Sequence, residues 1–128
     1  MHPHETALRQ GYAAFAAGDL ATLERLFSPD VVWHEPGQNP ISGSYKGWPE
    51  VLRLLTSYAE RSGGTFKAEL SDVLVNDRRA ISVAQVTGSR DGRRLDQGDH
   101  LLADFDGDRI VEARVLYHDQ QAVDAFWS

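Results

Sequence analysis

The sequence predicts one α+β domain, with helices in its first half and an antiparallel sheet in its second. Apolar side chains recur at helical spacing before residue 62, whereas apolar and polar side chains alternate after residue 65. Pairs of turn-forming residues at 76–77, 91–92 and 106–107 divide that second half into four segments of strand length. A chain of 128 residues, 41% of them hydrophobic, is long enough to bury one core. Together these observations favour helices packed against one face of a curled sheet.

The first two helices are predicted over residues 4–17 and 20–27. In the first, Leu8, Tyr12 and Phe15 recur at the 3.6-residue period of an amphipathic helix. Gly18 suits the left-handed position that follows a helix end, and Asp19 can cap the helix that comes next. We therefore expect two consecutive helices separated by a short turn.

The remaining elements follow from local turn signals. Residues 28–30 predict a turn, 31–35 a short strand, and 36–47 a loop rich in Pro and Gly. Pro49 fits the first turn of a third helix, which Gly63 and Gly64 end. Strands are predicted over 65–75, 79–90, 93–105 and 109–118, and a closing helix over 120–127.

The composition excludes several classes of partner and chemistry. The formal net charge is −6 and the basic residues form no cluster, so we expect no binding to nucleic acid. There is no cysteine, which excludes disulfides and thiolate chemistry. No run of about 18 apolar residues occurs, and the N-terminus lacks an apolar segment of signal-peptide length. We therefore expect no membrane association and a cytoplasmic location.

The order of the predicted elements and four sequence stretches resemble a known family. The stretches are AAGDLATLERLFSPDVVWHEPG, SGSYKG, FDGDRIVEARV and AVDAFW. They resemble the SnoaL-like branch of the nuclear transport factor 2 superfamily, which also contains ketosteroid isomerase, limonene epoxide hydrolase and polyketide cyclases. The resemblance covers residues 1–128 as a single domain. It implies a conical fold, in which a curved antiparallel sheet wraps around the N-terminal helices and encloses a single deep pocket, but it does not imply one reaction.

Strand alternation predicts which side chains face that pocket. If Trp33 points inward, Glu35 does too, and His34 points away. Small inward residues such as Ser82 and Gly88 leave room for a ligand, although helix side chains could fill the same space. Core packing is also the alternative to ligand contact for the Tyr on the first helix. The residues that we expect to bind a substrate are Tyr12, Phe15, Trp33, Ala84, Val86, Leu101, Ala103 and Val115.

Three side chains are candidates for acid–base catalysis. Glu35, in the motif HEP before the loop, lies where the resemblance places the general-base aspartate of ketosteroid isomerase. Desolvation at the edge of an apolar pocket would raise its pKa and suit it to proton transfer, and the alternative is a rim carboxylate that accepts hydrogen bonds from the loop backbone. Asp99 could supply a second acid or be a solvated residue beside a turn. Tyr117 could stabilise an oxyanion or pack in the core.

Other features of the related enzymes do not match this sequence. The positions of the ketosteroid isomerase oxyanion hole carry Gly11 and Leu101, and the Asp–Arg–Asp set of limonene epoxide hydrolase is not evident. His34 and Glu35 point to opposite faces of a strand and cannot readily share an ion, so we expect no metal and no cofactor. The leading hypothesis is a cofactor-independent isomerase, cyclase or hydrolase that acts on a small, largely apolar molecule. The alternative is a non-catalytic ligand-binding protein of the same fold.

The opposite face of the predicted sheet is also partly apolar. It carries Ile81, Val83, Leu102 and Leu116, and a face of this kind needs a cover. We expect a second copy of the chain to provide it, which predicts a homodimer. The sequence leaves open whether residues 36–47 form the rim or a lid of the pocket.

Overall fold

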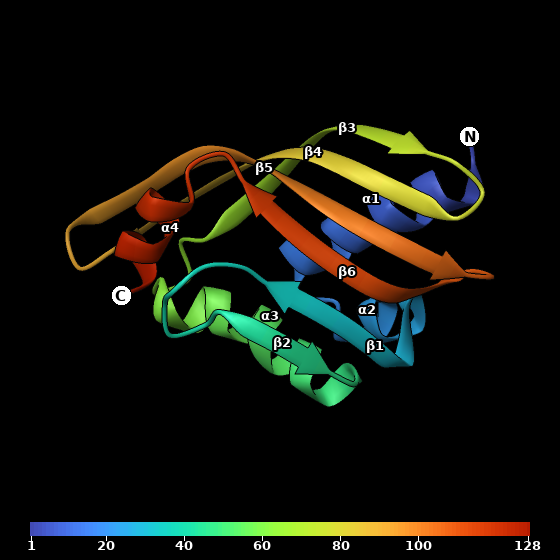
Figure 1. Ribbon diagram of the computed structural model, residues 1–128, viewed down its shortest axis with the longest axis horizontal. Helices are drawn as coiled ribbons and strands as arrows, with labels where there is room; N and C mark the ends of the chain where they lie inside the picture. The colour runs from blue at the N-terminus through green and yellow to red at the C-terminus, as the bar shows by residue number, and fades with distance from the viewer.

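The computed structural model describes residues 1–128 and has the α+β class that the sequence predicts (Figure 1). Helices lie against one face of a curved sheet, and a short fourth helix lies at one end of the sheet. The elements are α1 (Pro3–Ala17), α2 (Leu20–Leu26), β1 (Phe27–Glu35), β2 (Gly43–Lys46), α3 (Trp48–Arg61), β3 (Lys67–Val75), β4 (Arg79–Arg90), β5 (Arg93–Asp106), β6 (Arg109–Tyr117) and α4 (Gln120–Trp127).

One six-stranded sheet contains every strand, in the order β2-β1-β6-β5-β4-β3. Strands β3 to β6 form the predicted antiparallel meander, because each pairs with the next along the chain. Strand β1 joins this meander as the parallel neighbour of β6, with Trp33 opposite Ala113. The parallel pairing brings the motif around Trp33 beside the last strand, although the two are far apart in the sequence.

The first strand is longer than predicted. It begins at Phe27, so residues 28–30 are part of β1 rather than a separate turn. Phe27 pairs with Ile110, and the register with β6 shifts before Val32. Pro29 lies within this irregular part, where the lack of a backbone N–H breaks no ladder hydrogen bond.

A second strand lies inside the segment that was predicted as a loop. Residues 43–46 form β2, which pairs antiparallel with β1 at the edge of the sheet. Only Tyr45 of its four residues is buried. An edge strand this short has too little alternation to be recognised from its sequence.

The helix ends follow the predicted signals. Gly18 has φ of 68°, the left-handed conformation that closes α1, and the Asp19 carboxylate accepts a hydrogen bond from the Thr22 backbone N–H at 3.1 Å. Pro49 lies in the first turn of α3. No helix has the length and apolar character needed to span a membrane.

Alternation along β4, β5 and β6 sorts the side chains as predicted. Ser82, Leu101 and Val115 face the helices and are buried. The outer face carries Ile81, Val83 and Leu102, which are partly buried, and two leucines that are largely exposed. These are Leu74, 56% exposed, and Leu116, 49% exposed.

Candidate active site

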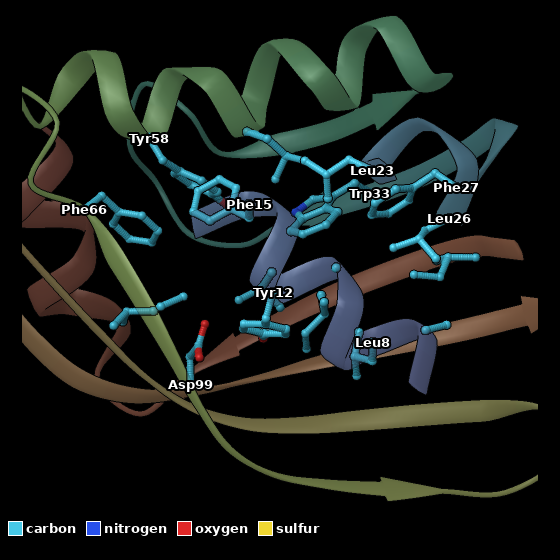
Figure 2. A pocket seen from close by; sticks show the side chains of 18 of the residues that line it. Leu8, Tyr12, Phe15, Leu23, Leu26, Phe27, Trp33, Tyr58, Phe66 and Asp99 are labelled. Atoms are coloured by element: carbon cyan, nitrogen blue, oxygen red, sulfur yellow. The ribbon is translucent and has the colours of Figure 1, made fainter. Parts of the chain in front are cut away.

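A cavity of about 90 Å³ lies between the first three helices and the inner face of the sheet (Figure 2). Its lining is apolar or aromatic except for one glycine and one acid, and it contains no basic side chain. The lining residues are Ala7, Leu8, Gly11, Tyr12, Phe15, Leu23, Leu26, Phe27, Trp33, Leu55, Tyr58, Phe66, Ala68, Val86, Asp99, Leu101, Ile110, Val115 and Tyr117.

Most of the residues that we expected to bind a substrate line this cavity. The exceptions are Ala84 and Ala103, which are buried but lie outside the lining. Gly88 is also covered, because a Cβ built on it would lie 3.4 Å from Cζ of Phe126. These small residues let the helices pack close to the sheet, and they do not leave space for a ligand. The sequence-predicted residues in the lining are Tyr12, Phe15, Trp33, Val86, Leu101 and Val115, together with Asp99 and Tyr117.

Asp99 is the only carboxyl group in the lining. It lies on β5, directly across from Tyr117 of β6, and is 7% exposed. Its Oδ1 atom is buried and has no hydrogen-bond partner, and Figure 2 shows the carboxylate pointing into the space beside Tyr12. Burial raises its pKa to about 7, because the charged form loses hydration and gains no donor in return.

Glu35 is more deeply buried than Asp99 and is not part of the lining. Its Oε1 accepts hydrogen bonds from Nε1 of Trp33, at 3.2 Å, and from the Tyr58 hydroxyl. Its Oε2 accepts one from the Tyr117 hydroxyl at 2.6 Å. Burial raises its pKa to about 7, even though these three donors stabilise the charged form and oppose the shift. Three cavity-lining side chains therefore separate Glu35 from any ligand in the cavity.

Tyr58 is the site residue that sequence reasoning missed. It lies on α3 at a position of the apolar face, where an aromatic side chain is usually core. The structure does bury it, but its hydroxyl donates to one oxygen of the Glu35 carboxylate while the Tyr117 hydroxyl donates to the other. Burial makes the largest contribution to raising the pKa of each tyrosine, so both hydroxyls stay protonated and can donate. No spacing in the sequence could have joined Tyr58 to residues on β1 and β6.

Tyr12 also lines the cavity, and its hydroxyl makes a contact that is independent of the hydrogen bonds around Glu35. Its hydroxyl lies 2.7 Å from Oγ of Ser82, which also accepts a hydrogen bond from the Leu101 backbone N–H at 3.0 Å. Burial raises the pKa of Tyr12, so this hydroxyl also remains protonated. The contact ties Tyr12 of α1 to Ser82 of β4.

The two carboxyl groups, Asp99 and Glu35, are the groups of the site that can transfer protons near neutral pH. Asp99 and Glu35 both have a pKa of about 7, and the charge of Asp99 contributes to raising that of Glu35. Each group is about half protonated near neutral pH, so together they hold about one proton. A pair that holds one proton can take a proton from a ligand and return it without any metal ion.

The loop after β1 is fastened to the last helix. The Asp124 carboxylate accepts hydrogen bonds from the Gln38 backbone N–H at 3.1 Å and from Asn39 Nδ2 at 2.7 Å. Gly37 has φ of 101° and packs so closely that a Cβ there would lie 2.2 Å from Asp124 Oδ1. These contacts hold the loop against α4.

A wider hollow of about 550 Å³ adjoins the cavity on another side. The two spaces share five lining residues, which are Phe15, Leu23, Leu55, Phe66 and Ala68. The hollow is bounded by the end of α1, the start of α2, α3 and the segment that enters β3. None of residues 36–47 lines either space, so this loop is not part of the cavity wall.

Gly11 offers a way to fill the cavity without disturbing the fold. It lies in the interior of α1 and lines the cavity, and a Cβ there would make only an ordinary contact, 3.6 Å from Leu26 Cδ1. Because glycine weakens a helix interior, Gly11→Ala is expected to raise the free energy of unfolding by about 0.5–1 kcal/mol. Gly11→Leu is expected to keep the fold and to abolish ligand binding.

Thermal unfolding and a ligand titration check both variants. The control is Gly18→Ala. Gly18 has φ of 68°, a conformation that disfavours alanine, so this substitution is expected to lower stability instead. Gly11→Leu with undiminished ligand binding would show that ligands bind elsewhere.

Comparisons with known proteins agree with this architecture. The sequence profile described as a SnoaL-like domain matches residues 8–113. Uncharacterized protein Rv0034 of Mycobacterium tuberculosis is 38% identical over 122 residues, which cover 94% of this chain and 93% of that protein. Bal32a, from a soil-derived mobile gene cassette, is 38% identical with a TM-score of 0.96 over 98% of this chain and 97% of its own. An NTF2-like protein of unknown function from Burkholderia pseudomallei shares the fold, with a TM-score of 0.88 at 17% identity over 100% of this chain and 99% of its own. The chain therefore belongs to the family of SnoaL-like domains, with the NTF2-like conical fold.

Proposed function

We propose that this protein is a cofactor-independent enzyme that transfers a proton within a small, largely apolar molecule, with Asp99 as the general acid and base. One observation carries the proposal. A carboxyl group with an unpartnered oxygen lies in an otherwise apolar cavity, and its pKa is raised to about 7. A group with this pKa exchanges protons in both directions near neutral pH. A purely structural aspartate would gain nothing from that position, because a buried, unpartnered carboxyl destabilises the fold.

The lining supports a neutral substrate with one polar group. Phe15, Trp33 and Phe66 provide aromatic contact surface, and no basic side chain is present to hold a carboxylate or phosphate. A cyclic ketone, an enone or an epoxide satisfies these requirements, since each combines an apolar body with one oxygen.

The proposed step is an enolisation. The Asp99 carboxylate accepts a proton from the carbon next to a carbonyl group. The electron pair of the broken C–H bond forms a C=C bond while the carbonyl π pair moves onto oxygen, which gives an enolate. Returning the proton from Asp99 to a different carbon completes an isomerisation. Attack of the enolate carbon on a second carbonyl breaks the π bond of that carbonyl, and transfer of the proton from Asp99 to the new alkoxide oxygen completes a cyclisation. Either sequence conserves electrons, so it requires no redox partner.

Glu35 would act on this step through Tyr117 and Tyr58. While Glu35 is ionised, both hydroxyls donate to it and neither can donate to a ligand. When Glu35 carries a proton, it can donate to one tyrosine, which frees that hydroxyl to donate to the substrate oxygen. We therefore propose that Glu35 is a positioning residue and that Tyr117, across from Asp99, stabilises the oxygen of the enol.

Hydrogen exchange in D₂O tests the proposal before a substrate is known. A panel of small cyclic ketones and enones is incubated with the protein, and loss of the α-proton signals is followed by NMR. We expect accelerated exchange for at least one compound that the protein binds. Compounds that bind and raise the melting temperature without any exchange would contradict the enzyme and favour the alternative, a ligand-binding protein of the same fold.

We also propose that two copies pair through the outer face of the sheet. Leu74 and Leu116 are about half exposed there, next to the partly buried Ile81, Val83 and Leu102. A stable pairing of this kind buries on the order of 1,000 Å² or more. Light scattering is expected to give twice the chain mass at tens of micromolar, and Leu116→Lys is expected to give the monomer. Leu20→Lys, at an equally exposed leucine on α2, is the matched control, and a monomeric parent protein would contradict the pairing.

A further inference from the structure

The outer face of the sheet carries a pair of histidines that the proposed activity does not use. His100 lies on β5 opposite Leu116 of β6, and His118 directly follows β6. Their Nε2 atoms are 3.4 Å apart, and their ring centroids are 5.3 Å apart. The pair lies at the margin of the apolar outer face, where His118 is exposed to solvent.

The other three histidines are engaged differently. In His2, His4 and His34, both ring nitrogens lie within hydrogen-bonding distance of backbone groups or oxygen-bearing side chains. Only at His100 and His118 does one ring nitrogen face another. This arrangement brings two potential metal ligands together without a carboxylate between them.

The backbone sets the tautomer of His100. Its Nδ1 lies 3.2 Å from the carbonyl oxygen of Ser82. Because a carbonyl only accepts hydrogen bonds, Nδ1 carries the proton, and in the neutral ring Nε2 presents its lone pair toward His118. Histidines that bind metals almost always have this contact, in which the far ring nitrogen donates to a carbonyl or carboxylate.

Gly98 makes room for the second ring. Its φ is not in the left-handed region, so its conformation does not require glycine. A Cβ built on it would lie 2.3 Å from Cε1 of His118. The missing side chain therefore allows the His118 imidazole to lie over β5, beside His100.

The spacing of the two rings matches that of two ligands on one ion. Two nitrogens bound at about 2.05 Å to a tetrahedral Zn²⁺ are about 3.35 Å apart, with ring centroids about 5.2 Å apart. The pair has 3.4 Å and 5.3 Å between the corresponding points. We propose that His100 and His118 form a two-histidine binding site for Zn²⁺ on the outer face of the sheet, with water as the remaining ligands.

The sequence offered no signal for this site. The two histidines are 18 positions apart on different strands, and neither belongs to a His-x-His or His-x3-His pattern. No group of three or more His, Cys, Asp or Glu side chains is present that could hold a metal ion, so the protein would supply two ligands at this site.

A Zn²⁺ titration against a competing chromophoric chelator tests the site on the full chain after treatment with EDTA. We expect saturable binding of one Zn²⁺ per chain. Loss of a ligand is expected to weaken the affinity at least about tenfold in both His100→Asn and His118→Asn. Saturable binding that neither substitution weakens, or no saturable binding at all, would overturn the proposal.

Two further variants distinguish Zn²⁺ binding at this site from weak Zn²⁺ binding by other histidines of the chain. Gly98→Ala keeps all five histidines but displaces the His118 ring, so it is expected to weaken binding as much as His118→Asn does. His34→Asn removes a histidine whose nitrogens are already engaged by Ser44 and Glu112, and it is expected to leave the affinity unchanged. Circular dichroism confirms that each variant is folded. Equal affinity in Gly98→Ala and the parent chain would contradict the geometry.

Discussion

Asp99→Asn is expected to lower turnover at least about a hundredfold in the hydrogen-exchange assay, the low end of the effect of a lost general base. Asparagine keeps the shape of the side chain but cannot accept a proton at neutral pH. The cavity is not expected to change size, so ligands that bind the parent chain are expected to bind the variant. The loss should therefore appear in the exchange rate and not in the affinity.

Asp96→Asn is the matched control for this substitution. Asp96 lies three residues earlier on the same strand, is exposed, and accepts a hydrogen bond from Gln85 at 2.8 Å. The Asp96→Asn variant is expected to exchange protons on the ligand as fast as the parent chain. If Asp99→Asn keeps full activity while Glu35→Gln loses it, the base is Glu35, as the family resemblance alone suggested.

Stability is expected to fall by several kcal/mol between pH 5 and pH 8. Burial raises the pKa of Asp99 from 3.8 to about 7 and that of Glu35 from 4.5 to about 7. A group whose pKa is higher in the folded state binds its proton more tightly there, so the fold is favoured at low pH. This stabilisation is lost as the pH rises from the unfolded to the folded value, and it is absent above about pH 7. At about 1.4 kcal/mol per unit, the Asp99 shift corresponds to about 4 kcal/mol and the Glu35 shift to about 3 kcal/mol.

Carboxyl groups whose pKa is lowered by folding affect stability at lower pH than this window. The pKa values of Asp19 and Glu50 are lowered, by hydrogen bonds from Thr22 and Arg53 respectively, so their contributions are lost only in more acidic solution. Urea unfolding at intervals between pH 5 and pH 8 measures the slope. The double variant Asp99→Asn, Glu35→Gln is expected to remove most of it. Stability that rises with pH across this range would show that the two carboxyls are ionised throughout.

The sequence predicted the fold well because its signals are local. The helical repeat of Leu8, Tyr12 and Phe15 and the turn pairs between the strands depend on near neighbours, and the structure has the corresponding helices and meander. Strand alternation placed Asp99 on the inner face for the same reason. The one strand that escaped prediction, β2, is short and lies at an edge, where the pattern is weakest.

The site was harder to predict because it depends on packing between distant elements. Alternation placed Glu35 on the inner face, but it could not show that Trp33, Tyr58 and Tyr117 would enclose the carboxylate. Inward Ala84 and small neighbours suggested empty space, whereas the helices approach closely enough to occupy it. The cavity instead lies beside Gly11 of α1 and Asp99 of β5. At Gly11 the helix has no side chain to fill the space.

The pKa of Asp99 is the measurement that tests the proposed chemistry most directly. The side-chain carboxyl carbon of Asp99, labelled with ¹³C, is followed by NMR from pH 4 to pH 9 in the parent chain and in Glu35→Gln. The account predicts a titration near pH 7 in the parent chain, and a single, uncoupled step in the variant. A titration near pH 4, the ordinary value for aspartate, would mean that water or a hydrogen-bond donor reaches the carboxylate. Asp99 could not then exchange protons at neutral pH, and the account would be contradicted.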